Sequence, residues 1–468
     1  MRRSKRLAAT VFAGLAGVGL AACADSTGPG PQATVQSAAV VQPDSAPHTR
    51  LHVALDEPSA LQVTYWRAQD ANALQVTSGD VRANHEVFLP RTYASSEYLF
   101  QVRPVSSRGR TGAAYSGSFT TGALPAEVAA LQFTGTGEPS DSLAMIEMMI
   151  NNTGFGGGVI IVDEAGRIVW YWKGQGGFLM GASRRANGNW VFHDAGRIVE
   201  VTPDRRAVAV LPNAGPATDY GTIHHDLVAT PQNTVFFIAN DARVYPDSTV
   251  VGEAIWEWFP EQNRTEKRWS AFDFMSWPED RGPDSDKSNW MHMNSLVVGA
   301  RGNVLFSSRS LDQVVSIAPD FGAVEWRLGG VNATIPATGD AHFSGQHNIS
   351  EVAPNRILMW DNGRRRTIGE FSRGLELAVS PQTGSVTRVA EFRATPDRLQ
   401  PIVGGAYRMA NGNTLITYGW GGGDQINIYE LAGETTTRWH LTAPGTVERI
   451  YKARTLPSIA GERRVPRP

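Results

Sequence analysis

Cysteine is almost absent from this chain, which has a single one, Cys23, among 468 residues. A domain that follows it can therefore hold no internal disulfide and no thiolate metal site, so burial must stabilise it. Charged residues are also sparse, at 19%, and 43 basic side chains face 45 acidic ones. A net charge near zero gives no indication of a basic groove for nucleic acid, so we do not expect nucleic acid as a partner. Helical periodicity is weak throughout the sequence.

Glycine and tryptophan, in contrast, are plentiful, with 48 and 13 residues. Glycine allows tight turns, and the composition is typical of an all-β protein with many of them. The length leaves room for two or more domains.

The N-terminal residues have the features of an export signal. Four basic residues between positions 2 and 6 precede an apolar stretch, Leu7–Leu20, that is too short to span a bilayer as a helix. The stretch continues into Ala21-Ala22-Cys23, which resembles the lipobox of bacterial lipoproteins. The resemblance implies removal of residues 1–22, acylation of Cys23 and a lipid anchor on the periplasmic or cell-surface side of the envelope. The alternative is an ordinary signal peptide with an incidental cysteine.

A small β domain is expected after a flexible linker. Residues 23–50 are rich in Pro, Gly, Ser, Ala and Gln, which predicts a tether. Residues 51–122 contain alternating stretches such as Leu61–Trp66 and Tyr98–Arg103, which predict half-buried strands. Their last part, residues 115–122, resembles the final strand of a fibronectin type III domain, so we predict a β-sandwich of that kind.

Residues 123–455 carry a degenerate repeat. One half is a polar turn that leads into a hydrophobic strand, and its turn asparagines are Asn189, Asn233, Asn303, Asn355 and Asn413. The other half is an alternating strand that ends in tryptophan, found at Ile168–Trp172, Ile255–Trp258, Val324–Arg327 and Thr437–His440.

The spacing of the turns matches propeller blades of roughly 40–50 residues with insertions, the clearest of them at 259–289. With the segment Val159–Trp172 counted as an earlier blade, the pattern predicts a six-bladed β-propeller, and seven blades is the alternative. Residues 456–468 are expected to form a C-terminal tail.

Four short motifs carry the candidate chemistry. They are His224-His225-Asp226, Trp290-x-His292-x-Asn294-Ser295, Ser307-Ser308-Arg309 and Gly345-Gln346-His347-Asn348. Each histidine motif precedes a hydrophobic strand of a different predicted blade, and the arginine follows such a strand. In a ring of blades these side chains should converge on the central channel.

In this order and combination, the motifs resemble the bacterial arylsulfate sulfotransferase family. The resemblance extends over residues 50–450, approximately, and implies a six-bladed propeller behind a small β domain. It also implies transfer of a sulfuryl group from a phenolic sulfate ester to an acceptor phenol without the nucleotide donor PAPS. The expected reaction is ping-pong, through a sulfo-histidine, with no cofactor and no metal.

Matched motif by motif, the resemblance assigns a role to each residue. His347 corresponds to the nucleophile that becomes sulfurylated, and Arg309 to a cationic clamp on the sulfate. His292, with Asn294 beside it as a substrate-binding residue, corresponds to a group that contacts the sulfuryl and bridging oxygens.

The pair His224 and His225 supplies a further site histidine. We predict a catalytic role for His224 and substrate binding for His225, and the motif leaves open which of them faces the channel. Asp226 is predicted either to orient a neighbouring imidazole or to end a strand.

The residue types suit this chemistry independently of the resemblance. Neutral imidazole is a competent nucleophile near pH 7, because its ordinary pKa is about 6.5. Arginine and histidine donors stabilise the charge that develops on sulfate oxygens. The tryptophans of the insertion at 259–290 are expected either to stack on aryl rings or to pack the insertion onto the propeller. His193, His342 and His440 are expected to be structural.

Two functions of other classes remain open. One is a metal-dependent hydrolase or lactonase with histidine ligands, although carboxylates are not consistently placed beside the histidines. The other is a non-catalytic surface-binding propeller. A nucleotide-dependent sulfotransferase is disfavoured, because no glycine-rich phosphate loop opens a βα unit. The expected partners are a phenolic sulfate, a phenol and, through the lipid anchor, a membrane.

Overall fold

A computed structural model describes residues 33–41, 47–175, 178–366, 370–421, 425–443 and 445–468. The predicted signal peptide and the lipidation site at Cys23 lie outside these ranges. Strands dominate, and the described helices are short turns: α1 (Ala126–Ala129), α2 (Ala271–Phe274), η1 (Pro260–Gln262) and η2 (Gly339–Ala341). The all-β prediction is therefore confirmed. Nowhere in the described ranges is there a helix long and apolar enough to cross a membrane.

The front domain is one antiparallel sheet in the order β31-β3-β2-β4-β5, with β1 paired to β2. Its strands are β1 (Val35–Val41), β2 (Thr49–Trp66), β3 (Asn72–Leu89), β4 (Glu97–Val105), β5 (Tyr115–Thr120) and β31 (Arg463–Pro466). Alternate residues of the long strands, such as Leu61, Val63 and Tyr65, are buried in its core.

Two strands lie in stretches for which the sequence predicted no regular structure. Strand β1 falls within the predicted tether of residues 23–50, and it pairs with β2. Strand β31 falls within the predicted tail of residues 456–468, and it pairs with β3. Backbone pairing with a distant strand orders both stretches, and local composition carries no signal for such pairing.

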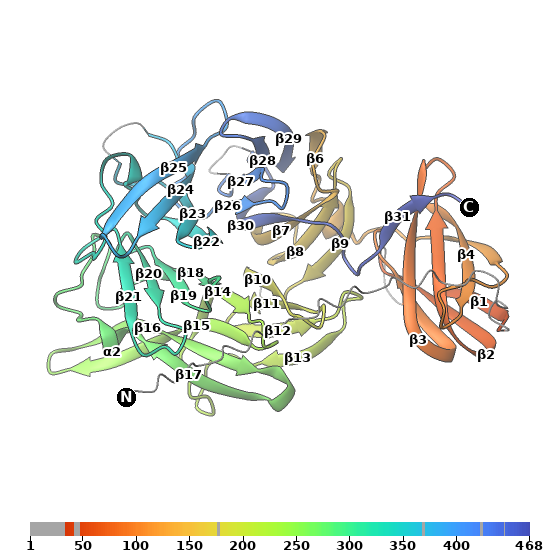
Figure 1. Cartoon of the computed structure of the whole chain (residues 1–468), viewed down its shortest axis with the longest axis horizontal. Helices are drawn as coiled ribbons and strands as arrows, with labels where there is room; N and C mark the ends of the chain where they lie inside the picture. The colour runs from red at the N-terminus through yellow and green to blue at the C-terminus, as the bar shows by residue number, and fades with distance from the viewer. Residues whose placement is uncertain (1–32, 42–46, 176–177, 367–369, 422–424, 444) are drawn as a thin grey trace, which may run out of the picture.

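Within the described residues, six further antiparallel sheets surround a common centre (Figure 1). The first three are β10 (Leu179–Arg184), β11 (Trp190–Asp194), β12 (Arg197–Val201) and β13 (Ala207–Leu211); β14 (Ile223–Ala229), β15 (Val235–Tyr245), β16 (Ser248–Phe259) and β17 (Arg264–Ser270); β18 (Met293–Val298), β19 (Val304–Ser308), β20 (Gln313–Ile317) and β21 (Val324–Leu328).

The other three sheets complete the arrangement. They are β22 (His347–Ala353), β23 (Arg356–Asp361), β24 (Arg373–Ser380) and β25 (Ser385–Phe392); β26 (Gly405–Arg408), β27 (Thr414–Tyr418), β28 (Ile426–Ala432), β29 (Thr436–Ala443) and β6 (Thr134–Gly137); β30 (Val447–Leu456), β7 (Leu143–Asn151), β8 (Gly158–Asp163) and β9 (Ile168–Lys173).

The first strands of successive sheets pack against one another, from β10 through β14, β18, β22 and β26 to β30. The last sheet joins the two ends of the region, because C-terminal β30 pairs with β7 and β7 packs against β10. The arrangement is consistent with a propeller-like fold. It places the six first strands around the centre, where the motif histidines lie.

The turn asparagines occupy equivalent places in the sheets. Each lies just before a second strand, namely β11, β15, β19, β23 or β27. Asn233 and Asn355 adopt positive φ values of 65° and 59°, which asparagine tolerates better than most residues. The tryptophan-tipped strands do not share one place, because β16 is a third strand whereas β9, β21 and β29 are fourth strands.

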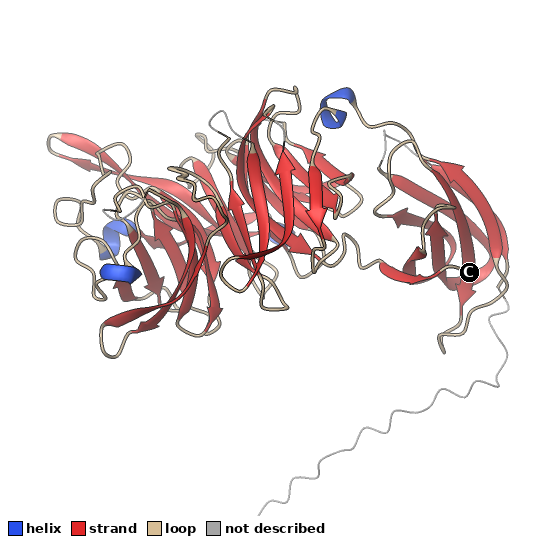
Figure 2. Cartoon of the chain, turned by 90° about the horizontal axis from the view of Figure 1, so that it is seen from above, coloured by secondary structure: helices blue, strands red, loops and turns tan. Residues whose placement is uncertain are grey.

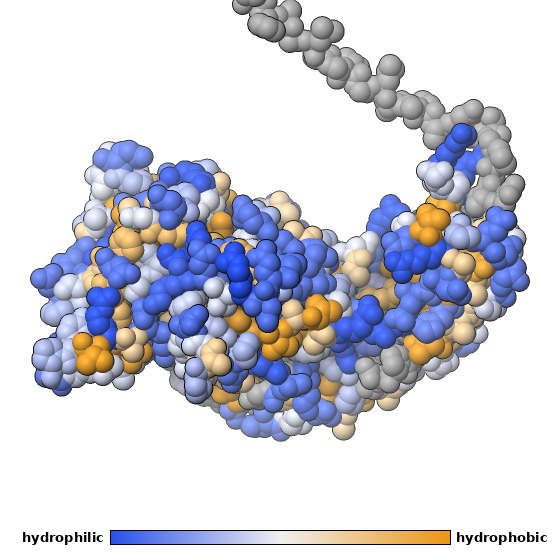
Figure 3. Space-filling model, turned by 90° about the horizontal axis from the view of Figure 1, so that it is seen from below, coloured by the Kyte–Doolittle hydropathy of each residue, from blue (hydrophilic) through white to orange (hydrophobic). Residues whose placement is uncertain are grey.

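The insertion between β17 and β18 is packed by its own aromatic side chains. Trp277 and Trp290 are buried together with Phe272 and Met275, and the Trp290 indole nitrogen donates to the carbonyl of Asp280. Of the two predicted roles for these tryptophans, the structure favours packing. The front domain lies to one side of the ring (Figure 2), and the face seen from below is mostly hydrophilic (Figure 3).

Candidate active site at the first strands

The histidine motifs lie at irregularities in three neighbouring first strands. The pairing register shifts within β14 between Ile223 and Leu227, and within β22 between His347 and Ser350. Strand β18 has a similar shift after Met293. Such bulges redirect side chains away from the regular ladder and are common beside active sites.

Backbone strain marks the same places. His225 and His292 adopt positive φ values of 55° and 51°, and Asn348, next to His347, has a φ of 45°. Non-glycine residues rarely adopt this conformation, and strain of this kind clusters at functional sites.

The strained strands bring the histidines together. The rings of His225 and His292 have centroids 4.6 Å apart, and the rings of His224 and His225 are 5.0 Å apart. Burial, and then the proximity of His347 and His224, lower the pKa of His292 to about 4. Residues separated by more than a hundred positions therefore form one cluster of neutral imidazoles.

The serine-arginine motif connects the other two motifs. Ser308 donates its hydroxyl to the carbonyl of Met291 at 2.6 Å, and the backbone N–H of Arg309 donates to the carbonyl of His292 at 3.1 Å. The side-chain amide of Gln346 donates to the carbonyl of Ser308 at 3.0 Å. These bonds fix the loops that carry His292 and His347 relative to each other.

Hydrogen bonds determine the tautomer of His347. Its Nδ1 lies 3.0 Å from the carbonyl of Gly345 and 2.7 Å from Oδ1 of Asn362. The Asn362 amide nitrogen donates to the carbonyls of Gln400 and Val403, so its oxygen must face the imidazole. Because both neighbours of Nδ1 are acceptors, Nδ1 carries the proton and Nε2 keeps a free lone pair. Burial lowers the pKa of His347 to about 4, so the ring is neutral at pH 7.

His292 has the opposite tautomer. The side-chain nitrogen of Asn289 donates to its Nδ1 at 2.9 Å, which leaves the proton on Nε2. The site thus combines one imidazole with a free Nε2 lone pair and one with an Nε2–H donor. A nucleophilic displacement needs both kinds of group. The free lone pair attacks the electrophilic atom, and the N–H donor stabilises the leaving oxygen.

A buried carboxyl group lies behind the His292 turn. Glu253 on β16 is 3% exposed, and its Oε1 accepts the N–H of Met293 at 3.4 Å. Its Oε2 is buried without a partner, and burial raises the pKa of Glu253 to about 8. Glu253 is therefore protonated at pH 7 and supports the strained turn as a neutral group.

Arg309 is connected to this cluster through its backbone, because its N–H donates to the carbonyl of His292. Its Nε is buried and has no hydrogen-bond partner, and no carboxylate in the described part of the chain forms an ion pair with it. A structural ion pair of Arg309 with a carboxylate therefore has no support among the described residues. A partly buried guanidinium without a counter-charge is suited to an oxyanion ligand.

The remaining predicted residues lie beside this cluster. His225, rather than His224, contacts His292, and the two Nδ1 atoms of the pair lie 2.8 Å apart. Burial, together with the neighbouring imidazoles, lowers the pKa of His225 well below its ordinary value. Asn294 is fully buried, and its amide nitrogen donates to the carbonyl of Gln346. The roles predicted for these residues stay predictions.

Asp226 connects strands, and none of its hydrogen bonds in the described structure is made to an imidazole. It accepts hydrogen bonds from the backbone N–H groups of Leu227 and Leu296, and its Oδ1 lies 2.8 Å from Nζ of Lys452. The hydrogen bonds of two other histidines agree with the expected structural roles: His193 bonds to the carbonyl of Ile223, and His440 bonds to Asn427.

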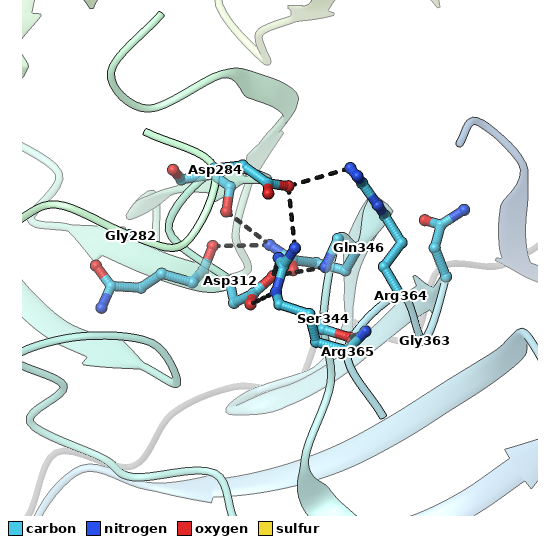
Figure 4. Close-up of polar contacts among 12 residues, drawn as sticks. Gly282, Asp284, Asp312, Ser344, Gln346, Gly363, Arg364 and Arg365 are labelled. Carbon is cyan, nitrogen blue, oxygen red and sulfur yellow. Dashed lines mark hydrogen bonds and ion pairs between the residues drawn. The ribbon is translucent and has the colours of Figure 1, made fainter. Parts of the chain in front are cut away.

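An arginine-carboxylate network contacts the loop that precedes His347 in the sequence (Figure 4). Asp284 accepts from Arg364 at 3.1 Å and from Arg365 at 3.0 Å. Asp312 accepts from the Arg365 Nε at 2.7 Å and from the N–H of Gly345 at 2.6 Å. Gly345 has a φ of 63°, and a Cβ there would lie 2.8 Å from Arg364, which explains the glycine of the Gly-Gln-His motif.

Sequence reasoning missed the groups that set the two tautomers and the buried carboxyl. Asn362 and Glu253 lie outside the recognised motifs, and Asn289, which precedes Trp290, was given no role. Their side chains meet the histidines only through the folded arrangement. No group of three or more His, Cys, Asp or Glu side chains in the described ranges could hold a metal ion.

Comparison with known proteins gives one family and several distant likenesses. A family model described as arylsulfotransferase (ASST) matches residues 137–442. No curated protein matches the chain.

Three solved structures illustrate the distant likenesses. A protein of unknown function from Bacteroides caccae has 14% identity and a TM-score of 0.45, covering 67% of this chain and 98% of that one. Virginiamycin B lyase from Staphylococcus aureus has 12% identity and a TM-score of 0.37, and the match covers 67% of this chain and 99% of that one. An auxiliary nutrient binding protein from Bacteroides ovatus has 8% identity and a TM-score of 0.37, covering 85% and 82%. At these values the likenesses carry no argument about function.

Proposed function

Because the chain belongs to the arylsulfotransferase family, we propose that it transfers a sulfuryl group from a phenolic sulfate ester to an acceptor phenol through His347. Membership confirms the family predicted from the motifs. It implies small-molecule aryl sulfate and phenol substrates. We also propose that the six sheets are the six blades of a propeller, and that the front sheet is a fibronectin type III-like domain.

The observation that carries the proposal is the hydrogen bonding of His347. In the first half-reaction its Nε2 attacks the sulfur, the bond from sulfur to the aryl oxygen breaks, and an aryloxide leaves. The sulfo-histidine that forms has a positively charged imidazolium ring and a negatively charged sulfonate, and the proton on Nδ1 is held by the oxygens of Gly345 and Asn362. Two acceptors on that proton stabilise the intermediate as the charge develops.

The neighbouring groups act on the oxygens. The Nε2–H of His292 donates to the departing aryl oxygen, and Arg309 binds the sulfuryl oxygens. The released aryloxide takes a proton from solvent. In the second half-reaction an acceptor phenol attacks the sulfur, its proton passes to solvent through the His224–His225 pair, and the bond from sulfur to Nε2 breaks.

Positioning dominates such a mechanism. Sulfuryl transfer should resemble phosphoryl transfer, whose loose transition state needs alignment and charge stabilisation more than covalent assistance. Our proposal routes no step through a nucleotide or a metal ion. A metal-dependent hydrolase would need a set of ligands, and no observation on the described residues favours one.

The proposal is tested by kinetics with an aryl sulfate donor. The protein should release phenol faster when a second phenol is added, and initial rates at several acceptor concentrations should give the parallel double-reciprocal lines of a ping-pong reaction. His347→Asn should lower turnover by a factor of about 1,000 or more. The matched control His440→Asn, which changes a structural histidine, should leave turnover unchanged. If His347→Asn turned over the donor as fast as the wild type does, His347 would be ruled out as the nucleophile.

We further propose that the protein is exported and anchored to the envelope by acylation of Cys23, from the apolar stretch that precedes it. Cells fed labelled palmitate should label the unaltered protein and not Cys23→Ser. Equal labelling of the two would contradict the anchor.

A further inference from the structure

A cleft of about 390 Å³ lies between the front domain and the sheet formed by β7 to β9. Four arginines line it, Arg67 and Arg91 from the front domain, Arg167 from the turn between β8 and β9, and Arg464 from β31. Only two carboxylates, Asp70 and Glu164, are among the lining residues. The cleft is distinct from the histidine site, because no motif histidine lines it.

Tyr93 fastens the two walls of the cleft. The Cζ atoms of Arg67 and Arg167 each lie 4.1 Å from the centroid of its ring. Arginines from the two domains therefore pack on this one ring. Arg167 also donates to the Tyr93 hydroxyl at 2.8 Å, and that hydroxyl donates to Asp163 at 2.8 Å. The arginines on the two sides are thus held in fixed positions.

Arg91 differs from the other three arginines. Arg67, Arg167 and Arg464 have carboxylate partners in Asp70, Asp163 and Glu164. Arg91 has no carboxylate partner in the described part of the chain, and its Nη1 donates only to the hydroxyl of Ser142 at 3.0 Å.

The placement of Arg91 also suggests a ligand. The residue is 6% exposed, and its φ is 60°, a strained value for arginine. Its Nε and Nη2 have no described partner, yet they are not among the atoms sealed from solvent, so they open into the cleft. A buried cation without a counter-charge is costly, and a ligand with two oxygens would match the free side of the guanidinium fork.

We propose that this cleft binds the sulfate or phosphate monoester group of a small organic molecule, with Arg91 as its main contact. The volume is within the range of small-ligand sites and exceeds that of a bare ion, so the cleft has room for the organic part of an ester as well as for its anionic group. Because the walls belong to two domains, the bound ester also joins the front domain to the ring. The proposal does not depend on the sulfuryl-transfer chemistry at His347.

The first experiment uses crystals of the unaltered full chain soaked in sodium selenate, with selenium located by anomalous scattering. Selenate within hydrogen-bonding distance of the Arg91 guanidinium supports the proposal. Absence of selenate from the cleft overturns it, whatever is found beside Arg309. Occupancy beside Arg309 tests the proposed active site alone, so the two failures are distinguishable.

The second experiment is calorimetric titration with glycerol phosphate, in an Arg309→Gln background that removes the channel site. Adding Arg91→Gln should weaken binding by a factor of about ten or more, since a charged hydrogen-bonded contact is lost. The control Arg301→Gln alters an exposed arginine, paired with Glu325 outside the cleft, and should have no effect. Equal binding with and without Arg91 overturns the proposal.

Two further arms complete the design. If Arg91→Gln does not fold, Arg464→Gln at the half-exposed edge of the cleft replaces it, with an expected weakening of roughly threefold. To separate a soluble ester from a lipid headgroup, the full chain and Arg91→Gln are compared on vesicles containing phosphatidic acid. Weaker vesicle binding by Arg91→Gln supports a lipid source, whereas equal vesicle binding with an Arg91-dependent calorimetric signal supports a soluble ester.

Discussion

The histidine site and the interdomain cleft are two polar regions of one chain, and they are held together in different ways. In the histidine site, the imidazoles of His347 and His292 are fixed by neutral partners, the amides of Asn362 and Asn289. In the cleft, most guanidinium groups are fixed by carboxylates and by the ring of Tyr93.

The difference shows that the fold uses neutral partners where a side chain must react and charged partners where a contact must stabilise the structure. A neutral partner fixes orientation and tautomer without neutralising the reactive atom, so Nε2 of His347 keeps its lone pair. A carboxylate partner stabilises a cation and uses up its donors. We therefore expect substitutions at the histidine site to change rates with little effect on stability, and substitutions in the cleft to do the reverse.

The largest effect that sharpens this comparison is expected at Arg309. Arg309→Gln removes the charge that binds the sulfuryl oxygens and should lower kcat/KM for an aryl sulfate by roughly 100-fold to 1,000-fold. The midpoint of thermal unfolding should hardly change, because Arg309 has no ion pair in the described structure. A large loss of stability with normal kinetics would place Arg309 in a structural role.

A smaller loss is expected at Asn362, which holds the Nδ1 proton of His347. Asn362→Ala removes one acceptor and should lower kcat by roughly 10-fold to 100-fold, as loss of a group that orients a reactive ligand typically does. Asn427→Ala, which changes the partner of a structural histidine, is the matched control. In long-range ¹H–¹⁵N spectra, wild-type His347 should carry its proton on Nδ1, and a proton on Nε2 would contradict the proposed nucleophile.

The pH dependence provides a third test. Burial lowers the pKa of His347 and His292 to about 4, so both rings stay neutral when the pH falls from 7 to 5. The acid limb of kcat/KM, which reports the free enzyme, should therefore lie near pH 4. A nucleophile with the ordinary pKa of about 6.5 would lose roughly 30-fold in activity by pH 5. An acid limb near pH 6.5 would show that the imidazoles are exposed in solution.

Tyr93→Phe tests the cleft side of the comparison. It keeps the ring that contacts Arg67 and Arg167, and it removes the hydroxyl that contacts Arg167 and Asp163. We expect a loss of about 1–2 kcal/mol in the free energy of unfolding and an unchanged kcat. Thermal unfolding and steady-state rates on the same preparation measure both. A fall in kcat with unchanged stability would reverse the assignment of the two regions.

The smallest effect on activity is expected for Glu253→Gln. Because the amide replaces a protonated carboxyl of similar size, kcat at pH 7 should change by less than roughly twofold. The pKa of Glu253 is raised from 4.5 to about 8, so the folded chain retains a proton that the unfolded chain has lost. The stability associated with that proton is complete below about pH 4.5 and lost as the pH rises through 8. The free energy of unfolding of the wild type, measured with denaturant, should therefore fall over this pH range relative to that of Glu253→Gln. Parallel pH profiles would show that Glu253 is ionised.

Much of the fold could be predicted because its signals are local. A turn asparagine followed by a hydrophobic strand can be recognised from neighbouring residues alone, and each of these turns precedes the second strand of its sheet. The pairing of β30 with β7, and of β31 with β3, joins segments from opposite ends of the chain. No local pattern encodes those partners, so the sequence left β31 in a presumed tail.

The site shows the same limit. His292, His347 and Arg309 lie in recognisable motifs. The structure brings the two imidazoles together and bonds the backbone of Arg309 to that of His292. Asn362 lies 15 residues after His347, outside the motif, and reaches its Nδ1 only because the end of β23 returns to the start of β22. Glu253 lies in β16, and nothing in the neighbouring sequence distinguishes a buried carboxyl from an exposed one.

The central claim, that His347 carries the sulfuryl group, is tested most directly by peptide mass spectrometry after mixing the protein with an aryl sulfate and no acceptor. One added sulfuryl group on the imidazole of His347, removed when a phenol is supplied, is the predicted result. A sulfuryl group on His292 or another residue, or an unmodified protein that still turns over the donor, would contradict it.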